Sequence, residues 1–99
     1  MGQRSGVPRD VRRRFRPLFA KIDRTYGSSC VTHKALLLMR RARRALGTLT
    51  YTEHQACVTI AMKYVEDEPC GVAHVFPGID IAALRLAEWK VMDAVKVGL

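Results

Sequence analysis

The sequence predicts an all-α protein, a small four-helix bundle with a kinked first helix and a central, mostly buried third helix. Three observations predict it. Apolar residues recur at three- and four-residue spacings in four successive segments, as they do on one side of an α-helix. Helix-start and helix-stop residues separate these segments. The chain of 99 residues is long enough for one modest core but not for two.

The first helix is expected to begin near Pro8, which suits the first turn of a helix. Residues 1–7 contain two glycines and show no apolar period, so we expect a flexible arm before a single helical domain over 8–99. Pro17 lacks an amide donor and disfavours helical geometry in the residue before it, which predicts the kink. The apolar stripe of this helix consists of Val11, Phe15, Leu18, Ile22 and Tyr26.

The second expected helix separates apolar from basic residues most clearly. Thr32 is the expected N-cap and Gly47 the expected stop. The stripe expected to face the core consists of Ala35, Leu38, Met39, Ala42, Ala45 and Leu46. Arginines occupy the opposite side, and Leu36 and Leu37 point outward among them. These two leucines therefore require a neighbouring helix or a partner.

The third helix is expected at the centre of the bundle. A capping box marks its start, formed by Thr50 with Glu53 or by Thr52 with Gln55. Apolar residues of the segment 56–65 spread over most of the circumference, which indicates packing on several sides. The residues expected to point inward include Ile60, Ala61 and Tyr64. Only a narrow polar strip remains, formed by Gln55, Thr59, Lys63 and Glu66.

A loop over 70–78 precedes the last helix, which Asp80 is expected to cap. Its packing stripe consists of Leu84, Ala87, Val91, Ala94 and Val95. Leu86, Trp89 and Met92 lie off this stripe. For Trp89 a place in the core is favoured over an interface role, because aromatic side chains are usually buried.

Charge is divided unevenly along the chain. Residues 1–46 contain thirteen lysines and arginines against two acidic residues, a net charge of +11. Residues 47–99 contain four against seven, a net charge of −3. The acidic cluster 66–68 falls at the end of the third helix, and an antiparallel hairpin holds it away from the arginines that end the second helix. The sequence therefore predicts an uncompensated basic surface and an anionic partner.

Two adjacent helices are expected to present this surface, and the candidate binding residues are Arg9, Arg12, Arg13, Arg14, Arg16, Arg40, Arg41, Arg43 and Arg44. The favoured function is non-enzymatic binding of DNA or RNA by gripping phosphates rather than by reading bases. The alternative is a small adaptor or inhibitor, of the size that viruses and phages often encode, which docks on an acidic or nucleic-acid-binding surface of a host protein. The arginine count favours nucleic acid, whereas Leu36 and Leu37, as apolar contacts, favour a protein partner.

Signatures of enzymes are missing from the sequence. It contains no glycine-rich phosphate loop with its lysine, no nucleophile elbow and no pair of carboxylates with an obvious shared cleft. We therefore expect no enzymatic activity and no cofactor. Three cysteine–histidine pairs have spacings that zinc could use, but buried thiols and scattered histidines explain them better, so no metal is expected. These pairs are Cys30–His33, His54–Cys57 and Cys70–His74.

The compartment and the oligomeric state are expected from similar arguments. Three cysteines without a framework spacing indicate reduced thiols in the cytoplasm. The longest apolar run, 35–39, is far too short to span a membrane, so no membrane partner is expected. The protein is expected to be a monomer or a homodimer, since Leu36 and Leu37 could also form a two-fold contact.

Overall fold

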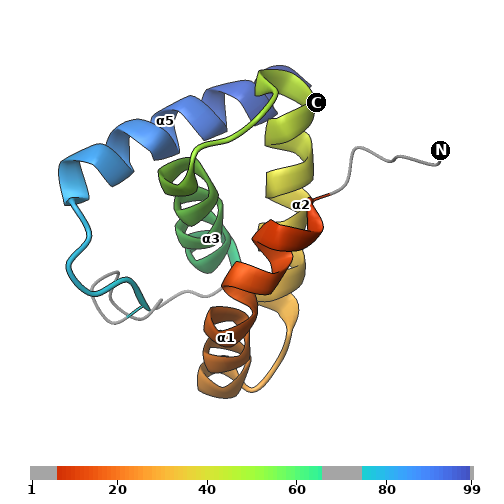
Figure 1. Cartoon of the computed structure of the whole chain (residues 1–99), viewed down its shortest axis with the longest axis vertical. Helices are drawn as coiled ribbons and strands as arrows, with labels where there is room; N and C mark the ends of the chain where they lie inside the picture. The colour runs from red at the N-terminus through yellow and green to blue at the C-terminus, as the bar shows by residue number, and fades with distance from the viewer. Residues whose placement is uncertain (1–6, 66–74, 99) are drawn as a thin grey trace, which may run out of the picture.

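The computed structural model describes residues 7–65 and 75–98, excluding the side chains of the last two. These ranges contain no strand and form four helices: α1 (Arg9–Tyr26), α2 (Cys30–Leu46), α3 (Tyr51–Val65) and α5 (Ile81–Gly98). In Figure 1, α3 stands at the centre, α5 crosses above it, α2 lies to its right and α1 lies in front below. Helices α2, α3 and α5 pack against one another, while α1 packs mainly on α2. The predicted all-α bundle is confirmed.

Helix α1 follows Pro8 directly and continues through Pro17 without a break. Its ribbon changes direction part-way along, in agreement with the predicted kink (Figure 1). Gly27 ends the helix in the left-handed conformation, with φ 71°, which glycine adopts at little cost. Of the arm expected over 1–7, only Val7 is described, and its half-buried side chain packs against the core.

Helix α2 begins at Cys30, two residues before the expected cap Thr32. The reason is that Thr32 has another partner, since its hydroxyl donates a hydrogen bond to Asp23 Oδ1 of α1 at 2.6 Å. This bond joins the end of α1 to the start of α2. It leaves the N-cap position to Ser29.

The end of α2 differs from the predicted stripe. Gly47 stops the helix as expected, with φ 86°, but Ala45 and Leu46 are exposed instead of buried. The chain turns back at Gly47, and the buried side chain of Leu49 packs into the core in their place. The rest of the stripe is buried as predicted.

Helix α3 is the central element, as predicted. Every residue from Glu53 to Met62 is buried, Ile60 and Ala61 among them. The prediction for Tyr64 is wrong, because its side chain is 64% exposed. Tyr64 lies in the last turn of α3, where the helix leaves the core, and Lys34 Nζ of α2 lies 5.5 Å from the centre of its ring.

The polar strip of α3 is largely covered by α5. Gln55 and Thr59 are buried, and the Thr59 hydroxyl donates a hydrogen bond to Glu88 of α5. Glu88 also forms an ion pair with Lys63 at 3.1 Å. Periodicity identified this side as polar but did not reveal that α5 packs on it with a polar side chain of its own. The last residue of the predicted strip, Glu66, lies outside the described residues.

Both predicted helix starts in the second half of the chain are confirmed. Thr50 and Glu53 form a reciprocal capping box, in which each backbone N–H donates to the other side chain, at 2.9 and 3.1 Å. Asp80 Oδ1 accepts hydrogen bonds from two N–H groups in the first turn of α5, those of Ala82 and Ala83. The predicted stripe of α5 is buried at all of its positions. No helix in the described ranges has the length and apolar character needed to cross a membrane.

Truncating the core of α3 should destabilise the protein strongly. Ile60 is 3% exposed, so Ile60→Ala is expected to lower the free energy of unfolding by about 2–5 kcal/mol, through lost burial and the cavity that remains. Leu86→Ala is the matched control, because Leu86 is 73% exposed and its truncation should change stability by less than about 0.5 kcal/mol. Urea denaturation measures both, and equal effects would contradict the central position of α3.

Candidate functional site

Three arginines of α1 lie beside α2 along a groove of about 390 Å³. This basic groove is lined by Val7, Arg9, Arg12, Arg16, Phe19 and Leu36. Leu36 is half-buried and packs against the core, so α1 is the neighbouring helix that this leucine requires. Leu37 is also half-buried. Neither leucine is fully exposed among the arginines.

The arginines of α2 point in three directions. Arg40 and Arg44 are exposed on the outer side of the helix. Arg41 is half-buried on the side that faces α5, and Arg43 is half-buried on the side that faces α1 and the start of α3. One helix therefore contributes to three neighbouring surfaces, because 40, 41, 43 and 44 are separated by rotations of about 100° per residue.

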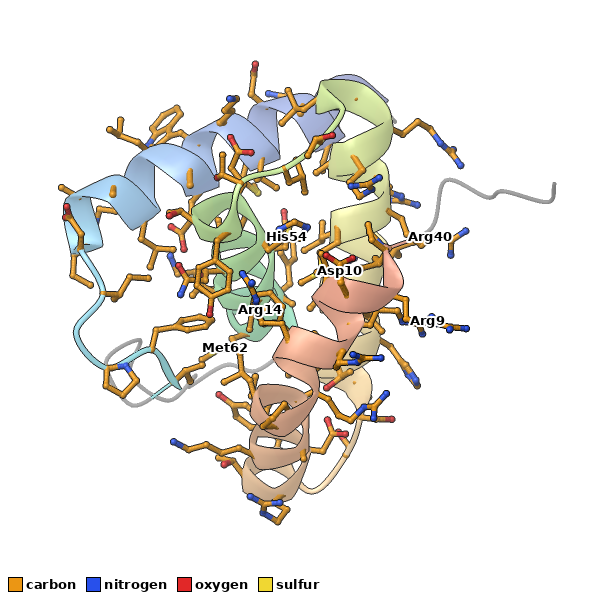
Figure 2. The ribbon with its side chains drawn as sticks, in the orientation of Figure 1. Arg9, Asp10, Arg14, Arg40, His54 and Met62 are labelled. Atoms are coloured by element: carbon orange, nitrogen blue, oxygen red, sulfur yellow. The ribbon has the colours of Figure 1, made fainter. Side chains whose placement is uncertain are left out.

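Arg14 does not join the other arginines of α1. Its guanidinium carbon lies 5.2 Å from the ring centre of Tyr51, at the first residue of α3. In Figure 2, Arg9 and Arg40 extend on the same side of the molecule, whereas Arg14 projects over its middle. We call the other exposed arginines of the predicted set, together with the half-buried Arg41, the arginine surface; it consists of Arg9, Arg12, Arg13, Arg16, Arg40, Arg41 and Arg44.

This surface is largely uncompensated by acidic side chains. Within 7–65 and 75–96, no salt bridge reaches Arg9, Arg12, Arg13, Arg16, Arg40 or Arg41. Two carboxylates at the α3–α5 contact instead bind lysines, Glu53 with Lys90 at 2.9 Å and Glu88 with Lys63 at 3.1 Å. The acidic cluster 66–68 lies outside the described residues, and so does the prediction about its position.

A small pocket of about 240 Å³ lies at the corner between α1 and the start of α3. Arg14, Arg43, Asp10 and His54 are among its lining residues. His54 is buried, and its Nδ1 lies 2.9 Å from the Thr50 carbonyl oxygen, which assigns the ring proton to Nδ1. Nε2 is buried without a hydrogen-bond partner among the described residues. The neutral ring is therefore the form that this corner accommodates.

Electrostatics support the neutral form of His54. Burial lowers the pKa of its imidazole below the ordinary 6.5, and the nearby charge of Arg43 lowers it further. The hydrogen bond to Thr50 and the charges of Glu53 and Asp10 raise it, but they do not reverse the shift. At neutral pH the side chain thus adds no charge to the arginine surface.

A third depression, between α2, α5 and the end of α3, was missed by the reasoning from sequence. We call it the aromatic groove; it measures about 630 Å³ and is lined by Lys34, Leu38, Arg41, Tyr64, Trp89, Met92, Asp93, Val95 and Lys96. Trp89 is 78% exposed, so the expected place in the core is wrong. The available signal was the off-stripe position of Leu86, Trp89 and Met92 on α5, which already placed them away from the packing side.

The cysteines that the structure describes lie in different environments. Cys57 is fully buried, and burial raises the pKa of its thiol to about 12, whereas Cys30 is exposed. Over the described ranges, no group of three or more metal-ligating side chains comes together. Cys70 and His74, the third predicted pair, lie outside those ranges.

Comparison with protein-family models, with curated proteins and with solved structures finds no match to this chain.

Burial of neutral His54 should make stability depend on pH. The unfolded chain binds a proton at His54 near the ordinary pKa of 6.5, while the folded chain resists protonation to a lower pH. The free energy of unfolding is therefore expected to fall as pH decreases below about 6.5. Urea denaturation across this range measures the slope. His54→Gln should flatten it, whereas the same change at the exposed His33 should not.

Glu53 contributes in a separate, more acidic window. Burial raises the pKa of its carboxyl, but the hydrogen bonds from Thr50 and the charge of Lys90 outweigh burial and hold the pKa below 4.5. Its stabilisation is present above pH 4.5 and is lost as pH falls through the lowered pKa. In Glu53→Gln, the fall in the free energy of unfolding between about pH 6.5 and pH 5 should therefore persist. Its disappearance would contradict the assignment of this pH dependence to His54.

Proposed function

We propose that this chain is a non-enzymatic nucleic-acid-binding protein that holds phosphates on its arginine surface. The observation that supports this most directly concerns exposed arginines of two helices that pack side by side. Among the described residues, no salt bridge reaches Arg9, Arg12, Arg13 and Arg16 of α1 or Arg40 of α2. Like charges held close together repel, and bound phosphates would relieve that repulsion. Binding would also release the counterions that surround the nucleic acid. Guanidinium groups also bind phosphate oxygens in a bidentate geometry.

Gripping the backbone suits this surface better than reading bases. In a helix-turn-helix reader, the helix after the turn enters the major groove with polar side chains. Here the helix that follows α2 and the Gly47 turn is α3, which is buried from Glu53 to Met62. Over this stretch α3 therefore offers no side chains to a groove, and the arginine surface would bind largely without regard to sequence.

The rival, an adaptor that docks on a host protein, has less support at this surface. Leu36 and Leu37 favoured this rival as apolar contacts for a protein partner. However, Leu36 packs against the core and lines the basic groove. That leaves Leu37, itself half-buried, as the apolar contact. An apolar residue of this kind gains nothing from phosphate.

Removing one arginine from each helix should weaken binding and its dependence on salt. For the wild-type protein on duplex DNA, the logarithm of affinity should fall linearly with the logarithm of salt concentration, by about 0.9 per phosphate contacted. Arg12→Ala with Arg40→Ala is expected to reduce this slope by roughly one to two units. Because both side chains are exposed, stability should change little. Fluorescence anisotropy of labelled DNA over a salt series measures the slope.

The matched control removes the same charge elsewhere. Arg24→Ala with Arg85→Ala takes two exposed arginines from the end of α1 and from α5, outside the arginine surface. This variant should retain most of the salt slope. Binding that ignores both salt and the Arg12 and Arg40 substitutions would refute the proposal. Loss of binding to a host protein in Leu37→Ser, with DNA binding unchanged, would support the rival.

A further inference from the structure

The aromatic groove exposes ring surfaces that proteins usually bury. The indole of Trp89 on α5 is 78% exposed, and the phenol ring of Tyr64 at the end of α3 is 64% exposed. Both line the same depression of about 630 Å³, whose floor is formed by apolar side chains from α2 and α5. Large exposed aromatic surfaces in a groove indicate a binding site rather than a solvated face.

The rim of the groove indicates the charge of its occupant. Among the described residues that line it, three are cations, Lys34 and Arg41 from α2 and Lys96 from α5, and one is an acid, Asp93. Lys34 Nζ lies 5.5 Å from the centre of the Tyr64 ring, a cation–π contact that keeps the charge beside the aromatic surface. The occupant complementary to this groove carries negative charge next to a flat apolar group.

The groove also continues the arginine surface. Arg41 lines the groove, and Arg40 and Arg44 follow it on the outer side of α2. A phosphate backbone that crosses α2 from the arginine surface therefore reaches the aromatic groove without leaving basic side chains. This continuity connects the charged occupant of the groove with the ligand of the proposed function.

We propose that the aromatic groove binds single-stranded nucleic acid, with an unpaired base stacked on Trp89 and the neighbouring phosphates held by Arg41, Lys34 and Lys96. The inference rests on the proposed function and makes it narrower, because a duplex keeps its bases stacked inside and cannot offer one to the indole. Stacking on an aromatic side chain tolerates any base, which agrees with a surface that grips the backbone.

Other occupants fit the groove less well. A second copy of this chain would bring the same three cations against these three, and like charges across an interface oppose association. An acidic amphipathic peptide would also satisfy the cations, but it has no nucleobase to stack on the exposed Trp89 ring. Tryptophan fluorescence distinguishes a single strand, a second copy of the chain and an acidic peptide as occupants of the groove.

Trp89 is the only tryptophan of the chain, so intrinsic fluorescence reports directly on this groove. The folded protein is titrated with an unlabelled single-stranded oligonucleotide of mixed sequence and, separately, with a duplex of equal length. The single strand should quench the tryptophan emission, and the duplex should bind with little quenching. Anisotropy of labelled oligonucleotides then measures affinities in the variants. Trp89→Leu should weaken single-strand binding by roughly five- to a hundredfold and leave duplex binding nearly unchanged.

Leu86→Ala is the control, because Leu86 is exposed on the same helix but does not line the groove. It should bind both ligands as the wild-type protein does. Circular dichroism checks the fold of each variant. The fluorescence quenching titration uses the wild-type protein and does not depend on how a variant folds. If salt-sensitive binding persists without quenching, and Trp89→Leu binds the single strand normally, the inference is overturned while the proposed function stands.

The remaining outcomes separate the two proposals. Absence of binding to both oligonucleotides at low salt would overturn the proposed function and the inference together. A blue shift of the tryptophan emission with rising protein concentration, matched by a dimer in sedimentation, would assign the groove to a second copy. Quenching by an acidic amphipathic peptide, without quenching by the single strand, would assign it to a protein partner.

Discussion

The burial of α3 is the constraint on which the rest of the molecule depends. Ten consecutive residues, Glu53 to Met62, have no appreciable contact with solvent, so other elements must cover every side of this helix. Four of the ten are polar, and burying them unpaired would be costly. Thr50 at the helix start and the side chains of Glu88 and Lys90 on α5 bind Glu53, His54 and Thr59. With the inner side of α5 fixed in this way, the remaining side chains of that helix must face outward.

The fold could be predicted from the sequence to the extent that local signals decide it. Capping residues such as Thr50 and Asp80 act within one turn, and apolar spacing gives the packing side of α5 correctly. The errors concern what covers a given side. Periodicity cannot reveal that α5 brings Glu88 to the polar strip, or that α3 leaves the core before Tyr64, because both depend on how helices cross.

The candidate site was predictable to a similar degree. The helices that present the arginines follow from periodicity, because exposed positions are those outside the apolar stripes. Arg14, however, turns to Tyr51, and Arg43 turns to the pocket that contains His54. Which arginines meet across α1 and α2 depends on the angle between these helices, and no local signal in the sequence specifies it. The aromatic groove was missed for the same reason, since Lys34 and Trp89 are far apart in the chain.

The attachment of α1 has a consequence for the dynamics of the protein. This helix packs less extensively than the other three, and it sets Arg9, Arg12 and Arg16 beside a helix that is itself basic. Local opening of α1 therefore requires less free energy than global unfolding, and the repulsion between the two helices lowers that requirement further. An anion that bridged both helices would offset this repulsion and hold α1 in place. If the proposed function holds, ligand binding and the closing of α1 onto the bundle form a single linked equilibrium, in which each favours the other by the same free energy.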